Sequence, residues 1–365
     1  MRNTNMQMAK NKRQSCSQAS PLLGETQRGI LGARIFHLIQ LSLCIFRLRR
    51  RKASRAMHLL LLVVLLAIGC FQNVNAQQKP MFTHYVFNDY YYNPAVASTK
   101  EGADFKFLYR HQWAGLEGQP QTATFSPCGS LKKFPLGLGG NFYFDKTGPL
   151  KNIGFNVSAS YGIRLGEAKD KSMIAAGISF GIIRFSMDNG TSTRDPNDAA
   201  VVAAQDGKIA PDIGLGVYYK WKGLYAGFSI PQIAQTSLKL GVDDPTDMNK
   251  LIRHYFVATG YKFKVADKFE LEPSLLIKGV KAAPVQGDFT VRGIYDEMIW
   301  LGAAYRTGDA ACIFAGVLIK EMFEIGYAYD ITTSNLNSVS NGSHEIIVAY
   351  KWKREKGKSS GYEVR

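Results

Sequence analysis

From Lys100 onward, apolar and polar residues alternate along most of the chain with a period of two. Successive side chains of a β-strand point to opposite faces, so this pattern is typical of a strand whose two faces meet different surroundings. Between Asp104 and Trp113, the aromatic residues share one face and most of the charged residues share the other. The same split recurs over residues 269–279 and 344–352. The pattern predicts an all-β fold.

Segments of this kind recur about fourteen times after residue 102. Most are nine to thirteen residues long, which matches the roughly 9–11 residues that a tilted strand needs to cross a membrane. Bacterial outer-membrane barrels also have an even number of strands. We therefore predict a transmembrane antiparallel β-barrel of about 14 strands over residues 103–352. The predicted strands are 103–113, 122–131, 136–145, 153–165, 172–187, 212–221, 224–232, 254–265, 269–280, 287–294, 298–307, 311–319, 323–331 and 344–352.

The connections between these strands favour the same architecture, because outer-membrane barrels have short periplasmic turns and longer outside loops. The even-numbered connections are short, as at residues 222–223 and 266–268. The fifth, seventh and thirteenth are long, around 188–211, 233–253 and 332–343. The eleventh is short and breaks a strict alternation.

A soluble β-sandwich or barrel is the structural alternative, since its strands also alternate. Its strands are usually about five or six residues long, however, and its outer faces are polar. Here the apolar face is rich in aromatic residues near strand ends, which is typical of the aromatic girdle at a membrane interface. Glycines within predicted strands, such as Gly137, Gly139 and Gly140, fit a curved barrel wall. The girdle residues would be Trp113, Tyr219, Trp221, Trp300, Tyr350 and Trp352.

The region before the barrel carries processing signals. Residues 57–76 hold an apolar run that is too short to span a bilayer and end in Val74-Asn75-Ala76, as a secretory signal peptide does before cleavage. The sequence before Cys70 fits a lipoprotein signal poorly. We expect residues 1–56 to be a disordered leader from a start codon assigned too far upstream, although residues 49–55 would supply the positive charge that signal peptides need.

Removing the leader changes the charge argument. Residues 1–56 contain twelve of the 45 basic residues and one of the 29 acidic residues, so the remaining chain has a net charge of +5 instead of +16. This balance excludes nucleic acid as an expected partner. Two cysteines remain, Cys128 and Cys312, with no metal-like spacing, and the sequence does not assign a disulfide.

Residues 77–102 form a separate aromatic segment ahead of the first strand. Six aromatic residues and the pair Asn93-Pro94 lie between Met81 and Ser98, without the alternation of a strand and with a proline that interrupts a helix. Because exposing this many aromatic rings to water would be costly, we predict that the segment is a plug in the barrel lumen or a docking surface at its rim. The candidate docking residues come from this segment and from the first outside loop. They are Tyr85, Phe87, Asn93, Pro94, Trp113 and Gly115.

At this point the sequence resembles a known family. The stretch QQKPMFTHYVFNDYYYNPAVAS, the following FKFLYRHQWAGLEGQPQTATFSPCGSL and the final EIGYAYDITTSNLNSVSNGSHEIIVAYKW are similar to the PorP/SprF family of type IX secretion system membrane proteins. The similarity covers 77–352, leaving out residues 1–56 and the basic tail 353–365. One departure is that the usual NPAYAG reads NPAVAS here. The matching positions are Tyr85, Asn88, Asn93, Pro94, Ala95, Tyr109, Arg110, Gln112, Trp113, Gly115, Gly118, Pro120, Tyr329, Asp330, Gly342, His344 and Glu345.

The resemblance implies an outer-membrane protein that anchors secreted surface proteins, such as gliding adhesins, or assists their export. Implied partners are the C-terminal domain of a secreted surface adhesin, the periplasmic type IX secretion components and outer-membrane lipid. An outer-membrane channel for a hydrophobic or small solute is the alternative function.

Charged residues on the polar face are expected to point into the lumen and to form ion pairs there. For catalysis, an outer-membrane lipid hydrolase would need a serine near a histidine, but Ser343 and His344 are neighbours in a strand and point to opposite faces. No nucleotide-binding or zinc motif occurs, so we expect no enzyme activity, cofactor or metal site. The candidate lumen charges are Lys106, Arg110, Glu270, Glu272 and Arg292.

Overall fold

The computed structural model describes residues 79–131, 134–166, 172–188, 207–236, 251–281 and 283–353. The predicted leader 1–56 and signal peptide 57–76 lie outside these ranges, as does the basic tail except for Lys353. Most of the fifth and seventh connections also lie outside them. No helix in the described ranges is long and apolar enough to cross a membrane.

The alternating segments form strands of one antiparallel sheet. Most strands coincide with a stretch in which outward apolar residues alternate with inward residues that are mainly polar or small. The strands are β1 (Gly102–His111), β2 (Gln121–Ser130), β3 (Leu136–Thr147), β4 (Leu150–Leu165), β5 (Ser172–Met187), β6 (Lys208–Trp221), β7 (Leu224–Ile230), β8 (His254–Tyr261), β9 (Phe263–Ala266), β10 (Phe269–Val280), β11 (Ala283–Tyr295), β12 (Ile299–Arg306), β13 (Ala310–Ile319), β14 (Phe323–Thr332) and β15 (Ser343–Lys353).

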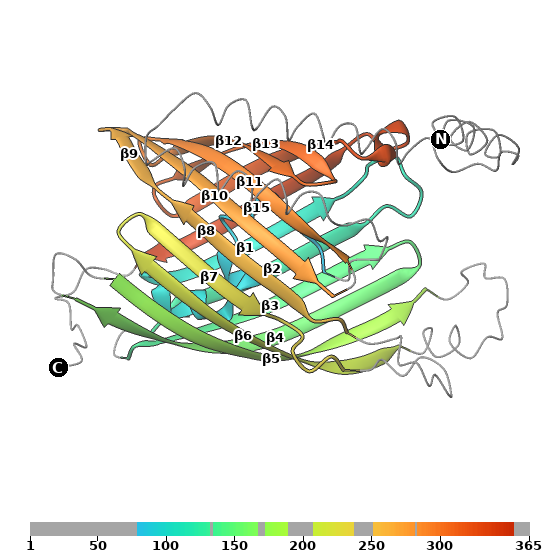
Figure 1. The fold of residues 1–365 in the computed structure, drawn as a ribbon, viewed down its shortest axis with the longest axis horizontal. Helices are drawn as coiled ribbons and strands as arrows, with labels where there is room; N and C mark the ends of the chain where they lie inside the picture. Colours follow the sequence, from blue (N-terminus) through green and yellow to red (C-terminus); the bar gives the residue numbers. More distant parts are fainter. Residues whose placement is uncertain are drawn as a thin grey trace, which may run out of the picture. The chain divides into compact units, whose positions relative to one another are not determined.

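The sheet closes on itself. Strands adjacent in the sequence pair with each other, and β1 pairs with β15. β8 and β9 are separated by Lys262 and both pair with β10, so they share one position in the wall. The described strands therefore make a closed barrel of 14 positions (Figure 1). This confirms the predicted fold and strand number, and β5 and β10 have the predicted bounds.

The connections follow the predicted rule only in part. The even-numbered turns are short, but the third connection, at residues 148–149, and the ninth, at 281–282, are short as well. The thirteenth, over residues 333–342, includes the 3₁₀ helix η2 (Asn335–Ser338). We assign the end with the even-numbered turns to the periplasm, because these turns are short throughout.

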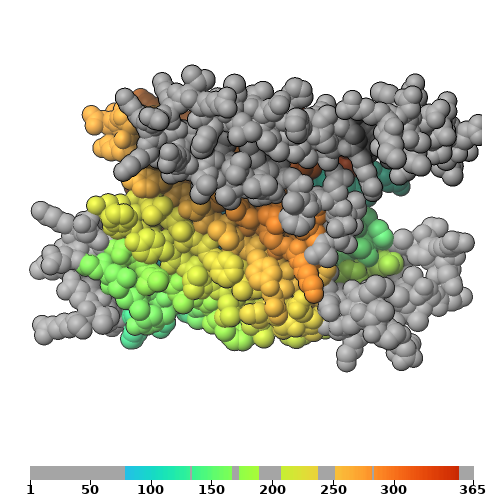
Figure 2. Space-filling model, viewed as in Figure 1, coloured from blue at the N-terminus to red at the C-terminus, as the bar shows by residue number. Residues whose placement is uncertain are grey.

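The two faces of the wall differ as the alternation predicts. In β1, Phe105 and Phe107 face outward and are 37% and 46% exposed, whereas Lys106 and Arg110 point inward and are buried. Large apolar side chains cover the outer face of β6, β7, β8 and β10, part of which Figure 2 shows from outside. This face suits lipid, since closure of the sheet gives every strand position in the wall a hydrogen-bonded neighbour on both sides.

The prediction for Trp300 was wrong. Its side chain is 3% exposed and points into the barrel, whereas Trp221 and Trp352 lie on the outer face as predicted. Ile299, Trp300 and Leu301 are all apolar, so alternation could not show which of them faces outward. Gly316 and Gly326 on β13 and β14 leave the space that the indole ring fills.

Residues Met81–Thr99, called the lumen segment below, lie inside the barrel and are mostly buried. They contain the short helix α4 (Asp89–Tyr92) and the 3₁₀ helix η1 (Pro94–Thr99). Proline disfavours helical conformation in the residue before it, so α4 ends at Tyr92 and Asn93 is extended. The Asn93 side chain then caps η1 by accepting a hydrogen bond from Ala95 N at 3.0 Å.

Candidate functional site

One buried carboxylate, Glu345 on β15, holds the start of the lumen segment. It accepts hydrogen bonds from the backbone N–H groups of Thr83 at 2.9 Å and His84 at 2.7 Å. Its Oε1 also lies 2.7 Å from Nδ1 of His84. Hydrogen bonds to a charged acceptor are stronger than neutral ones, so Glu345 fixes both the backbone and a side chain of the segment.

Glu345 belongs to a larger group of buried charges, called the ion-pair cluster below: Arg110, Asp288, Arg306, Asp330 and Glu345. Arg110 on β1 donates to Glu345 at 2.9 Å and to Asp330 on β14 at 2.6 Å. Arg306 on β12 donates to Asp330 at 3.2 Å and to Asp288 on β11 at 2.9 Å. All five side chains are at most 2% exposed.

The ion-pair cluster contains two guanidinium groups and three carboxylates, so its negative charge is in excess. Two side chains of the lumen segment contact these carboxylates. Thr83 donates from Oγ1 to Asp330 at 2.7 Å, and Nδ1 of His84 lies 2.7 Å from Oε1 of Glu345. Buried charges persist when each is paired and hydrogen bonded. The segment and the wall therefore stabilise each other here.

The predicted lumen charges fall into separate groups. Arg110 is in the ion-pair cluster, while Lys106 lies 3.4 Å from both Asp89 and Asp104. Glu272 and Arg292 face each other on β10 and β11 and form an ion pair. Glu270 is partly exposed near the periplasmic end and pairs with Lys262 at 3.4 Å.

Asp288 and Arg306 were not predicted from the sequence as site residues, and Asp330 and Glu345 were identified only as family-motif positions. Each of the four occupies an inward position of an alternating strand, and this position in the sequence could have predicted that it faces the lumen. Which of them pair depends on the register between strands.

The second half of the lumen segment, residues 90–98, packs closely against glycines of the wall. Gly177 on β5 leaves room for the backbone of Ala95, whose N would lie 2.5 Å from an added Cβ. Gly137 and Gly216 make similar room for Ser98 and Asn93, and Gly139 for the ring of Tyr90. Glycines 137 and 139 are thus required by close approach of the segment, not only by curvature of the wall as predicted.

Polar contacts fix the register of this half. Asn93 Nδ2 donates to the carbonyl oxygen of Val217 at 2.8 Å, and Ser229 Oγ donates to the carbonyl oxygen of Tyr92 at 2.6 Å. The N–H of Ser98 donates to Ser160 Oγ at 2.8 Å. Ser98 is, with Val96, one of the two positions where the sequence departs from the family pattern, and its backbone N–H makes this contact.

Aromatic rings fill the space between the two halves. The ring centroids of Phe87 and Trp300 are 4.2 Å apart. The guanidinium group of Arg292, on β11, lies 4.3 Å from the centroid of the Phe87 ring. Tyr92 packs edge-on against Phe256 at 5.1 Å, and its hydroxyl accepts from Phe82 N at 2.9 Å. The segment is folded on itself as well as packed on the wall.

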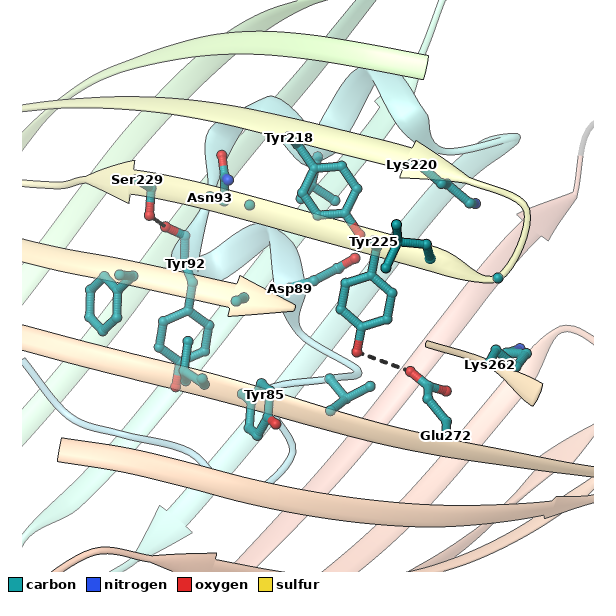
Figure 3. A pocket seen from close by; sticks show the side chains of 18 of the residues that line it. Tyr85, Asp89, Tyr92, Asn93, Tyr218, Lys220, Tyr225, Ser229, Lys262 and Glu272 are labelled. Carbon is teal, nitrogen blue, oxygen red and sulfur yellow. Dashed lines mark hydrogen bonds between the residues drawn. The ribbon is translucent and has the colours of Figure 1, made fainter. Parts of the chain in front are cut away.

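A cavity of about 380 Å³ lies between the lumen segment and β6, β7, β8, β10 and β11 (Figure 3). We call it the tyrosine cavity. It reaches the periplasmic end, where the exposed Lys220, Lys222 and Lys262 line it. Its lining also includes Asp89, Tyr218, Tyr225, Phe256, Ala258, Glu272, Leu276 and Arg292.

The candidate docking residues do not form one surface. Tyr85, Phe87 and Asn93 are buried in the lumen, with Pro94 partly buried beside them. Trp113 and Gly115 follow β1 at the outside end, where Ala114 exchanges backbone hydrogen bonds with Asn341 and Gly342 at 2.7 Å. The structure thus separates a lumen group from an outside loop group.

Comparisons with known proteins gave one family match. The model of the family "Type IX secretion system membrane protein PorP/SprF" matches residues 74–350. No curated protein matches the chain.

Solved structures with similar architecture are distant in sequence. Omp33, an outer-membrane protein of Acinetobacter baumannii, is 7% identical, with 69% of this chain and 99% of that chain covered and a TM-score of 0.41. A TodX deletion mutant, a monoaromatic hydrocarbon channel, is 11% identical over 75% and 95%, with a TM-score of 0.42. The toluene transporter TbuX of Ralstonia pickettii is 9% identical over 71% and 91%, with a TM-score of 0.39. These values are too low to transfer a function.

Proposed function

Since the chain belongs to the PorP/SprF family of type IX secretion system membrane proteins, we propose that it is a non-enzymatic outer-membrane component of that system. In this role it anchors secreted surface proteins, such as gliding adhesins, or assists their export. Its partners are the C-terminal domain of a secreted protein and periplasmic secretion components. The family match over residues 74–350 is the observation that carries this proposal.

The filled lumen supports an anchoring role. The lumen segment is joined to opposite parts of the wall by the Glu345 contacts at one end and by the glycine-lined strands at the other. A barrel braced from within in this way suits a protein that holds a partner at its surface.

The first and thirteenth connections, residues 112–120 and 333–342, are hydrogen bonded to each other and form the outside loop pair. This loop pair is the contact surface that we propose for the secreted partner. Trp113 has a backbone φ of 54°, a conformation that is unfavourable for a bulky residue. Backbone N–H of Trp113 donates to Ser343 Oγ at 3.1 Å, and Val339 in the facing loop is 59% exposed. Strained residues that the surroundings hold in place often occur at functional sites.

A channel for a hydrophobic or small solute is the second candidate function. The tyrosine cavity favours it, because a solute could enter the barrel from the periplasmic end as far as the lumen segment. Passage through the barrel would then require the segment to move.

Affinity purification separates the two functions. The tagged protein, without its leader and signal peptide, is recovered from detergent-solubilised outer membranes, and bound proteins are identified by mass spectrometry. We expect a large secreted protein or periplasmic secretion components, and less secreted protein with Trp113→Ala than with the control Trp221→Ala on the lipid-facing side. A barrel that emerges alone in mild detergent and conducts ions in planar bilayers would instead establish the channel.

A further inference from the structure

The charges that line the tyrosine cavity are unequally paired. Both acids are already neutralised: Asp89 lies 2.9 Å from Lys100 Nζ, and Glu272 pairs with Arg292 and accepts from the Tyr225 hydroxyl at 3.1 Å. In the described part of the chain, by contrast, no carboxylate lies within ion-pair distance of Lys220. At the cavity mouth, Lys220 therefore carries a positive charge that no carboxylate of the described residues contacts directly.

Two of the three lysines at the mouth are placed to act on a ligand. Figure 3 shows Lys220 and Lys262 on the same side of the cavity, near the β6–β7 turn. Lys262 also pairs with Glu270 at 3.4 Å, but that pair is solvent-exposed and therefore weak. Lys222 differs, because its Nζ lies 5.0 Å from the Trp221 ring, which is on the outer face.

Behind the lysines the cavity is lined by rings and aliphatic side chains. The rings of Tyr218 and Tyr225 are stacked, with centroids 6.4 Å apart and planes 13° from parallel. Phe256 and Leu276 close the inner end and are almost fully buried. The volume of about 380 Å³ falls in the range of about 300–1,000 Å³ that is typical of small-ligand pockets.

We propose that the tyrosine cavity binds a small amphipathic carboxylate from the periplasm. The anionic group lies between Lys220 and Lys262, and the apolar part extends past Tyr218 and Tyr225 toward Leu276. A cation at the mouth with an apolar interior favours this class over a neutral hydrocarbon, which would leave the lysines unused, and over a cation, which they would repel. This site is separate from the outside loop pair and does not depend on the proposed anchoring function.

The proposal is tested by titrating the purified full barrel with 4-phenylbutyrate in isothermal titration calorimetry. Two probes of related shape are the controls: 4-phenylbutanamide keeps the ring and chain without the charge, and butyrate keeps the charge without the ring. We expect saturable binding of 4-phenylbutyrate, weaker binding of both controls, and a loss of affinity for 4-phenylbutyrate at high salt because solvent-exposed charges are screened.

Variants locate the binding. Lys220→Gln combined with Lys262→Gln should weaken 4-phenylbutyrate about tenfold, because partly exposed ion pairs each contribute modestly, and should leave the amide unchanged. Lys268→Gln, on a neighbouring exposed turn outside the cavity, is the matched control and should have no effect. Ala258→Phe fills the cavity and should remove binding of both 4-phenylbutyrate and 4-phenylbutanamide.

Retained heat-modifiable mobility on gels shows that each variant is folded. Equal affinity for the acid and the amide, no saturable binding by the wild-type barrel, or an unchanged affinity in the double lysine variant would overturn the proposal.

Discussion

The two sides of the barrel hold the same segment by different means. The wall of β1 and β11–β15 presents the ion-pair cluster to Thr83 and His84, so it binds the segment through charge. The wall of β3–β6 presents glycines to residues 93–98, so it binds the segment through close backbone approach. The contact with β1 and β11–β15 is strong because its groups are charged. The contact with β3–β6 is close because its glycines have no side chains.

This difference has consequences for substitution. On the charged wall, loss of one group leaves its partner buried and unpaired. On the glycine wall, the harm comes from adding atoms. Each side should therefore be sensitive to a kind of change that the other tolerates.

The largest effect is expected from Glu345→Ala. It removes three contacts to the lumen segment and leaves Arg110 with Asp330 as its remaining acidic partner, which we expect to cost about 3–5 kcal/mol. The measurement is the urea midpoint of the purified barrel. Glu117→Ala, in the exposed first loop, is the control, and equal midpoints for the two variants would contradict the charge-based contact.

Gly177→Ala should have the next largest effect. The added Cβ would lie 2.5 Å from Ala95 N, and such overpacking costs about 1–3 kcal/mol. Gly140→Ala on β3 is the matched control, because the nearest atom to its added Cβ is 3.6 Å away. If both alanines are equally tolerated in thermal unfolding, the glycine wall does not hold the segment by shape.

The pair of Glu272 on β10 and Arg292 on β11, beside the charged wall, tests whether buried charges of the lumen are interdependent. Arg292→Met alone leaves Glu272 buried without its cation, whereas Arg292→Met with Glu272→Gln removes both charges. We expect the double variant to be more stable than the single one, with a coupling of about 0.5–3 kcal/mol in a double-mutant cycle. If the losses of stability from the two single substitutions simply add up in the double variant, the two residues act independently.

The smallest effect is a pH dependence at Asp89, which joins the lumen segment to β1 through Lys106. Burial opposes its charge, but the ammonium groups of Lys100 and Lys106 outweigh this and lower the pKa of Asp89 to about 2. A carboxyl group with a depressed pKa stabilises the fold above its unfolded pKa of about 4, and this stability is lost as the pH falls through about 2.

Asp89→Asn should therefore reduce stability by about 1 kcal/mol at pH 6, a value that allows for solvent screening of a partly exposed group. The difference from wild type should shrink between about pH 4 and pH 2. Asp267→Asn, in the exposed turn before β10, is the control. A difference that stays constant down to pH 2 would mean that the charge of Asp89 is not the cause.

Much of the wall was predictable because the signal is local. Alternation assigned the inward positions of Lys106, Arg110, Glu272 and Arg292 before any pairing was known. It failed at Trp300, where three successive apolar residues hide the parity. The glycines of β3 were noticed, but the sequence could not show that Ser98 and Tyr90 approach them.

The sequence by itself determined the strands, their number and the lipid-facing side, since side-chain direction alternates along any strand whatever its partners are. Only the tertiary structure decided which charges meet and where the lumen segment lies. Thr83 and Glu345 are 262 residues apart in the chain and meet because β15 closes on β1. Contacts of this kind depend on closure and register, which no local pattern of residues encodes.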